Sequence, residues 1–344
     1  MTQTFEIRRK TRGYLFIALA LLLLLAAISS VAIGQYDISL RDLPGLLKSG
    51  PVGFEGMDGS VLWQIRLPRL VLGLLVGAAL GVGGALMQAV FANPLAEPSV
   101  IGVTSGAGVG AAIIIVFGFN FLGSSTVPFA AFATGMLTTW LVYRLSRLGG
   151  RVRVVNLILV GIAVNAIAGA IISFFIFFAP TTSREQIIFW QMGTLSGAKW
   201  EHVGIVGGIV AFGLMCSWLL VKQLDLLALG DKAATHVGVD VTKLRTLSIV
   251  LATLLTAGAV SYAGLIGFVG LVVPHIVRTV AGPSNAVLIP ASALGGSLLI
   301  AGADIGSRTL ISFADLPIGI LTALIGGPTF FILLRRMMKK GAGV

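Results

Sequence analysis

Long apolar segments alternate with short polar connections along almost the whole chain of 344 residues. Most of these segments are close to the ~20 residues that a helix needs to span a bilayer. Ten can be drawn, at residues 15–33, 70–91, 99–119, 126–143, 154–179, 203–221, 246–262, 264–280, 287–303 and 316–334. The pattern predicts an all-α, polytopic integral membrane protein with ten transmembrane helices, organised as one domain over residues 1–344.

The seventh and eighth segments could also form one continuous helix. Such a helix, over residues 246–280, would be about 50 Å long at 1.5 Å per residue, against a hydrocarbon core of about 30 Å. Its small residues and its proline offer places to break, namely Gly258, Gly264, Gly267, Gly270 and Pro274. Two shorter spans are therefore expected.

Composition excludes a soluble globular chain, because 56% of the residues are hydrophobic and only 11% are charged. The net charge of +11 does not indicate nucleic-acid binding, since the basic residues form short clusters at the ends of apolar segments. Cys216 is the single cysteine and the three histidines lie far apart in sequence, so neither a disulfide framework nor a metal site is expected.

The basic residues also predict the orientation of the spans. With the N-terminus in the cytoplasm, 17 Lys and Arg residues fall on the cytoplasmic side and seven on the other, as the positive-inside rule requires. Ten spans then place both termini and residues 222–245 in the cytoplasm. Residues 34–65 and 180–200 become extracytoplasmic loops, the second an interfacial helix anchored by Trp190 and Trp200.

Small residues recur every four positions in the second and third segments. They are Gly73, Gly77, Gly81, Ala85 and Ala89 in one, and Gly102, Gly106 and Gly110 in the other. Such faces let helix backbones approach closely. The GAGVG run at 106–110 could be read as a phosphate-binding loop, but no strand precedes it, so helix packing is the preferred interpretation.

A charged island at Lys222 to Arg245, KQLDLLALGDKAATHVGVDVTKLR, separates two long apolar segments. Helical spacing of its apolar residues, followed by Gly238, predicts two short helices broken at that glycine. The island is either a cytoplasmic docking surface or an ordinary solvated loop.

Few residues in the spans could carry chemistry. No G-x-x-x-x-G-K-[ST] motif occurs, so if ATP drives this chain another subunit binds it. Glu97, between Pro94 and Pro98, is interpreted as a capping carboxylate rather than a proton relay. The scarcity of intramembrane carboxylates disfavours an ion-coupled secondary transporter, and no nucleophile, base or metal constellation supports an enzyme.

Three arginines on the outer side, Arg66, Arg69 and Arg308, run against the positive-inside rule. They either extend to lipid headgroups or pair with carboxylates of a partner protein. The sequence leaves both alternatives open.

Five segments together resemble the FecCD/BtuC-type permeases, the membrane subunits of ABC importers for iron siderophores, haem and cobalamin. They are RLPR (66–69), GALMQAVFANPLAEPSVIGVTSGAGVG (84–110), GDKAATHVGVDV (230–241), GLIGFVGLVVPHIVR (264–278) and LPIGILTALIGGPTFFILLRR (316–336). The resemblance covers residues 60 to 336, with the five segments in the family's order and spacing.

This resemblance implies a bacterial cytoplasmic-membrane protein that pairs with a second permease subunit, identical or different. Two cytoplasmic ATPase subunits bind the ATP, so no cofactor is expected in this chain, and an extracytoplasmic binding protein delivers the substrate. The motif carried over residue by residue implies ATPase-coupling contacts at Gly230, Asp231, Ala233, Ala234 and Gly238. Ala233 and Ala234 would lie in a cleft that admits only small side chains. Lys232 departs from the family, where acidic residues are common.

The resemblance further implies that Arg66, Arg69 and Arg308 receive glutamates of the binding protein. Transport would proceed by alternating access, along a path between the two permease subunits. Weakly polar residues are the candidates for its lining: Asn156, Asn165, Ser173, Thr104 and Ser105. Ferric siderophores are the expected substrates, with haem and cobalamin as alternatives.

Overall fold

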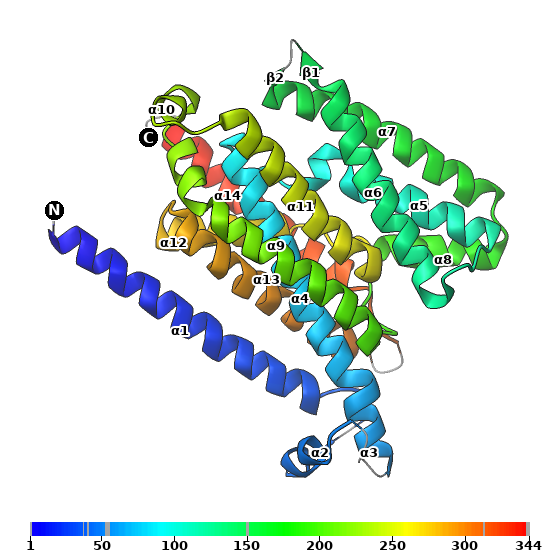
Figure 1. Ribbon diagram of the computed structural model, residues 1–344. Coiled ribbons are helices and arrows are strands. Elements are labelled where there is room, and N and C mark those ends of the chain that lie inside the picture. The colour runs from blue at the N-terminus through cyan, green and yellow to red at the C-terminus, as the bar shows by residue number, and fades with distance from the viewer. Residues whose placement is uncertain are drawn as a thin grey trace.

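The computed structural model describes residues 2–36, 38–39, 41–51, 56–148, 151–311 and 314–341, and these form a bundle of helices (Figure 1). Ten helices coincide with the ten predicted segments, which confirms the fold class. They are α1 (Thr2–Ala32), α4 (Leu67–Phe91), α5 (Val103–Phe117), α6 (Thr126–Leu145), α7 (Val154–Phe178), α9 (Trp200–Leu227), α11 (Val241–Ala263), α12 (Val269–Ala281), α13 (Asn285–Thr309) and α14 (Ile318–Gly341).

Shorter elements join the ten helices. The short helices are α2 (Leu43–Ser49), α3 (Gly56–Ser60), α8 (Thr181–Met192) and α10 (Asp231–His236). The strands β1 (Arg147–Leu148) and β2 (Arg151–Val152) form a small antiparallel hairpin between α6 and α7. A π-helical turn, Val61–Arg66, joins α3 to α4, so the last part of the predicted loop 34–65 is helical.

Eight of the described helices are long and apolar enough to cross a membrane, whereas α5 and α12 have only 15 and 13 residues. Each of these two short helices follows an interruption of helical structure. The third predicted segment divides at Gly102, whose φ of 85° ends a 3-10 turn. The break between α11 and α12 covers residues 264–268 and has positive φ at Gly264 and Phe268, so the predicted division into two spans is confirmed.

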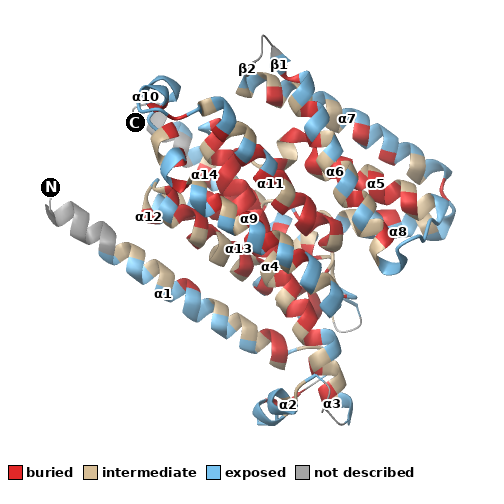
Figure 2. Ribbon diagram, in the orientation of Figure 1, coloured by how far each residue is buried: buried red, intermediate tan, exposed pale blue. Residues whose placement is uncertain are grey.

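Helix α4 lies at the centre of the bundle and is the most buried of the membrane-length helices (Figure 2). Its glycine face packs against α13. A Cβ on Gly77 would lie 2.3 Å from the carbonyl oxygen of Gly296, and a Cβ on Gly81 would lie 2.2 Å from that of Ser292. The backbones of the two helices therefore touch, as the spacing of small residues predicted.

The GAGVG run is also a packing face, as predicted. A Cβ on Gly106 would lie 2.2 Å from the Thr138 hydroxyl, and one on Gly110 would lie 2.2 Å from the Thr134 hydroxyl. Both threonines belong to α6, which contacts α5 closely. The glycines thus admit the side chains of a neighbouring helix rather than a phosphate.

The bundle has two distinct ends. Both chain ends, α10 and the β1–β2 hairpin lie at one end, and α2, α3 and α8 lie at the other (Figure 1). These are the same two groups of segments that the distribution of basic residues separates. The following text calls them the α10 end and the α2–α3 end.

The contact between α4 and α13 makes a prediction about stability. We expect Gly77→Ala to lower the free energy of unfolding by about 1–3 kcal/mol, because the new methyl group meets backbone that no side-chain rotation can move. Gly302→Ala is the matched control, since no atom lies within 4 Å of its added Cβ. Thermal unfolding of the purified variants in detergent measures the difference, and equal melting temperatures would contradict the packing argument.

Candidate functional site

The charged island at the α10 end is built from three elements rather than from two short helices. Helix α9 continues through the island's start to Leu227, the six-residue helix α10 follows, and α11 begins at Val241. The prediction of two short helices is therefore wrong, because the apolar spacing at its start belongs to the last turns of α9. The predicted break at Gly238 is confirmed, with a φ of 88°.

An ion pair holds α10 against α11, and a capped helix start and a glycine turn shape the chain on either side of α10. Arg245 of α11 donates two hydrogen bonds, of 2.9 and 2.8 Å, to the two carboxylate oxygens of Asp231. Asp240 is the N-cap of α11 and accepts a 2.9 Å bond from the amide of Lys243. Gly230, with a φ of 102°, provides the sharp turn into α10 that a residue with a Cβ would adopt only with strain.

The structure places the two predicted coupling alanines differently. Ala234 is fully buried within the chain, whereas Ala233 is exposed beside the exposed Asp231 and Gly238. Only Ala233 of this pair is thus available to a partner. An open depression of about 840 Å³ adjoins α10, lined by Arg153, Val154, Asp231, Lys232, Thr235, His236, Val239, Asp240, Val241, Thr242 and Arg245.

At the opposite end, the three outer arginines are turned into the protein. Arg66 is only 4% exposed and donates to the carbonyls of Val31, Ala32 and Tyr36, which follow or end α1. These carbonyls lack partners within the helix, and a cation at a helix C-terminus is favourable. The Tyr36 hydroxyl in turn donates to Asp58, and this bond raises the pKa of Tyr36 because the carboxylate stabilises the protonated hydroxyl.

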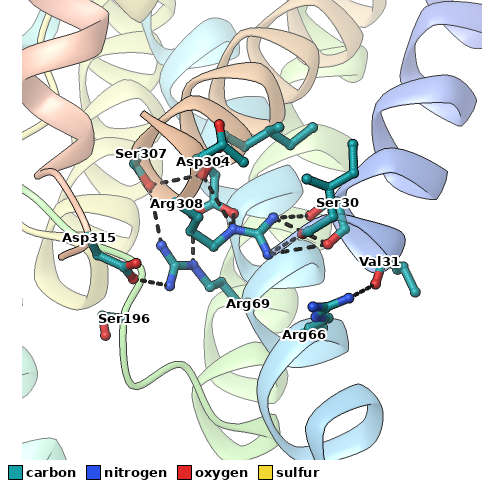
Figure 3. Close-up of polar contacts among 12 residues, drawn as sticks. Ser30, Val31, Arg66, Arg69, Ser196, Asp304, Ser307, Arg308 and Asp315 are labelled. Atoms are coloured by element: carbon teal, nitrogen blue, oxygen red, sulfur yellow. Dashed lines mark hydrogen bonds and ion pairs between the residues drawn. The ribbon is translucent and has the colours of Figure 1, made fainter. Parts of the chain in front are cut away.

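Arg69 and Arg308 share a buried carboxylate, Asp304 (Figure 3). The Asp304 oxygens lie 2.8 Å from Arg69 Nε and 3.1 Å from Arg308 Nε. Arg69 also pairs with Asp315 at 2.5 Å, and Arg308 donates to the Ser30 carbonyl at 3.2 Å. The network therefore joins the outer ends of α1, α4 and α13 to the loop before α14.

The burial of these arginines excludes one of the two alternatives that the sequence left open. Each is less than a tenth exposed, so the interpretation that they extend to lipid headgroups is wrong. Docking of a partner's carboxylates on them stays a prediction. Sequence reasoning missed Asp304 and Asp315 as their partners, although a carboxylate four residues before Arg308 was a signal for an i,i+4 pair.

The structure brings two of the five predicted path residues together. The Ser105 hydroxyl donates to Asn165 Oδ1 at 2.6 Å, and Asn165 Nδ2 donates to the carbonyl of Ser99 at 3.2 Å. These bonds join α5 and α7 to the turn before α5. Asn156 instead donates to the Ser146 carbonyl near the β1–β2 hairpin, and Ser173 is exposed on α7.

Thr104, the fifth predicted path residue, is half-buried and lines a cavity of about 130 Å³ together with Glu97 and Thr256. Glu97 occupies the N-cap position of the 3-10 turn, but its side chain makes no cap hydrogen bond there, so the interpretation as a capping carboxylate is wrong. It accepts a hydrogen bond from the Ser99 hydroxyl instead. The lining of the path by these residues stays a prediction.

Ten helices at the predicted apolar segments, eight of them long and apolar enough to cross a membrane, define a multi-pass membrane protein. The FecCD transport family model matches residues 21–336, so the chain belongs to this family. That match confirms the resemblance drawn from the five sequence segments.

Curated relatives match most of the chain. The hemin transport system permease protein of Yersinia pestis is 34% identical over 94% of this chain and 96% of its own. The vitamin B12 import system permease protein of Klebsiella pneumoniae is 36% identical over 97% of each chain. The cobalamin import system permease protein of Halobacterium salinarum is 41% identical over 80% of this chain and 73% of its own.

Solved structures give the same architecture. One, described as a metal-chelate type ABC transporter in an inward-facing conformation, superposes with a TM-score of 0.83 at 33% identity, over 94% of this chain and 99% of that one. A PsaBC structure from Streptococcus pneumoniae, at 17% identity and a TM-score of 0.55, shares the fold alone. The chain is therefore a permease subunit of an ABC importer.

The arginine network predicts different losses of stability when each of its two carboxylates is substituted. We expect Asp304→Asn to lower the free energy of unfolding by about 3–5 kcal/mol, because it leaves two buried arginines without their shared counter-charge. Asp315→Asn should cost less than about 1 kcal/mol, since that side chain is 28% exposed against 3% for Asp304. Thermal unfolding in detergent measures both, and an equal loss in the two variants would contradict the assignment of Asp304 as the centre of the network.

Proposed function

We propose that this chain carries ferric siderophores across the bacterial cytoplasmic membrane as the permease subunit of an ATP-driven importer. The observation that carries the proposal is the match to a permease family across residues 21–336. The similarity to a metal-chelate type transporter supports a chelated metal as cargo.

Haem or cobalamin is the second candidate substrate. The relatives named for hemin and for vitamin B12 are each more than 30% identical along almost the full chain, which supports this alternative. All three substrates are large organic metal chelates. A path lined by weakly polar side chains such as Asn165 and Ser105 suits such a cargo better than a charged filter would, because it binds the ligand weakly enough to release it.

The proposed assembly has two permease subunits, two cytoplasmic ATPase subunits and an extracytoplasmic binding protein. The α10 end faces the cytoplasm, as the excess of basic residues there supports. ATP binding closes the ATPase subunits, and the movement passes through residues 230–241 into α9 and α11, which flank α10 directly. Hydrolysis resets the cycle, and the substrate itself undergoes no chemistry.

Docking at the α2–α3 end would require Arg66, Arg69 and Arg308 to exchange their partners within the chain for carboxylates of the binding protein. Their internal partners already satisfy them, so a glutamate of the binding protein must replace Asp304 or Asp315, or a carbonyl at the end of α1. Asp315 is the most exposed of these carboxylates and Arg69 is its partner. This contact is therefore the first that an incoming carboxylate can replace.

Uptake by intact cells tests the substrate. We expect deletion of the gene to abolish accumulation of one ferric hydroxamate or ferric catecholate, and the intact gene on a plasmid to restore it. Haem and cobalamin belong to the same panel. Dependence of haem or cobalamin uptake alone would replace the siderophore proposal with the second candidate, and the absence of any dependent ligand would refute both.

A bulky side chain at Gly238 tests the coupling loop. No atom lies within 4 Å of an added Cβ there, so Gly238→Trp places a bulky side chain with open space around its Cβ at an exposed position of the island. We expect it to reduce uptake more than tenfold and to weaken co-purification with the ATPase subunits. Gly238→Ala carries the same backbone strain without the bulk, and an equal defect in that control would assign the effect to strain rather than to contact.

Substitution of Asn165 tests the proposed path. Asn165→Leu keeps a side chain of similar size but removes both hydrogen bonds that hold the turn before α5. We expect it to change uptake severalfold at normal protein levels, whereas Ile167→Leu, at an exposed position of the same helix and outside the predicted path, should leave uptake unchanged. Unchanged uptake in Asn165→Leu would contradict a role for Asn165 in the path.

A further inference from the structure

A groove of about 330 Å³ runs between α6 and α11 near the α10 end, outside the island, the arginine network and the predicted path. Its walls are largely apolar, and the two helices pack directly against each other beneath it. The lining residues are Met136, Thr139, Trp140, Tyr143, Arg144, Arg147, Thr246, Ile249, Val250 and Thr253. Trp140 and Val250 are exposed, so the groove opens to the surroundings of the bundle.

The groove carries positive charge at one end and is apolar toward the other. Arg144 and Arg147 stand at the end where α6 finishes and β1 begins, whereas Met136 and Val250 lie deeper along the helices. The two charged groups among the lining residues are both positive. A ligand that fills the groove is therefore apolar over most of its length and negative at the end nearest α10.

The two arginines are held in place at the groove by aromatic rings. The guanidinium carbon of Arg144 lies 5.7 Å from the centre of the Trp140 ring, and that of Arg147 lies 5.9 Å from the Tyr143 ring. Stacking of this kind uses the face of a guanidinium, so the N–H groups at the edge of Arg144 can bind an anion, and Arg147 adds a second positive charge beside it. The nearby Arg245 points elsewhere, to Asp231.

The groove also has the length of one leaflet. From Leu145, where α6 ends, back to Met136 the helix advances about 14 Å at 1.5 Å per residue, close to half of a hydrocarbon core of about 30 Å. Trp140 lines the groove and is exposed. The buried Thr139 also lines the wall, and its hydroxyl has no hydrogen-bond partner among the described residues.

We propose that this groove is a binding site for one anionic phospholipid of the phosphatidylglycerol type, from the leaflet at the α10 end. The phosphate lies between Arg144 and Arg147, and one acyl chain lies along Val250 toward Met136. Charge complementarity selects the headgroup, and the apolar walls hold the chain. The lipid would join α6 to α11, and α11 begins at the coupling island, so the site goes beyond the transported substrate and is independent of it.

Native mass spectrometry of the full chain, purified in mild detergent and supplied with phosphatidylglycerol or phosphatidylcholine, tests the site. We expect phosphatidylglycerol to be retained in preference to phosphatidylcholine. A basic residue near the surface contributes about 1 kcal/mol, so Arg144→Gln with Arg147→Gln should reduce retention about 30-fold. Lys222→Gln, exposed at the same end on α9 and outside the groove, should leave retention unchanged.

A second variant tests the groove without changing the charge. Val250→Trp fills the apolar part from an exposed position and should abolish phosphatidylglycerol retention while preserving the melting temperature. Equal retention of the two lipids, or wild-type retention in the double arginine variant, would overturn the proposal. Retention that survives Val250→Trp but depends on the arginines would also overturn it, because the lipid would then bind a charged surface and not the groove.

Discussion

The rest of the structure depends on the direct backbone contact between α4 and α13. At Gly77 against Gly296, and at Gly81 against Ser292, no side chain separates the two helices. In a membrane the hydrophobic effect does not drive helices together, so close packing of this kind supplies much of the association energy. It makes α4 the buried centre on which α9, α11 and α12 also pack.

The polar groups at the two ends of this pair then fix its neighbours. At the α2–α3 end, Asp304 joins arginines of α4 and α13, and Arg308 reaches the end of α1. At the α10 end, Asp225 of α9 accepts hydrogen bonds from the amide and the side chain of Asn285 at the start of α13. Because the polar groups of these two networks have partners at defined positions, the helices have little freedom to slide past one another.

This arrangement explains how movement at the island could reach the bundle. Helix α10 is clamped to α11 by the Asp231–Arg245 pair, and both α9 and α11 pack on α4. The positive-φ breaks at Gly102 and around Phe268 lie inside the bundle, between shorter helical pieces. Helices at the island and breaks in the interior fit the alternating-access cycle proposed for this chain.

The sequence by itself determined the ten helical segments, the division near Gly264, the glycine faces and the family, because hydropathy, small-residue spacing and motif order are local or periodic signals. Only the tertiary structure decided that Arg66, Arg69 and Arg308 are buried, that Ala234 turns inward while Ala233 turns out, and that Asn165 meets Ser105 and not Ser173. The partners of the arginines lie up to 278 residues away in the chain, and no periodicity in the sequence encodes which distant groups a side chain will meet. The groove between α6 and α11 arises for the same reason, since its two walls are separate helices that become one site only when they pack.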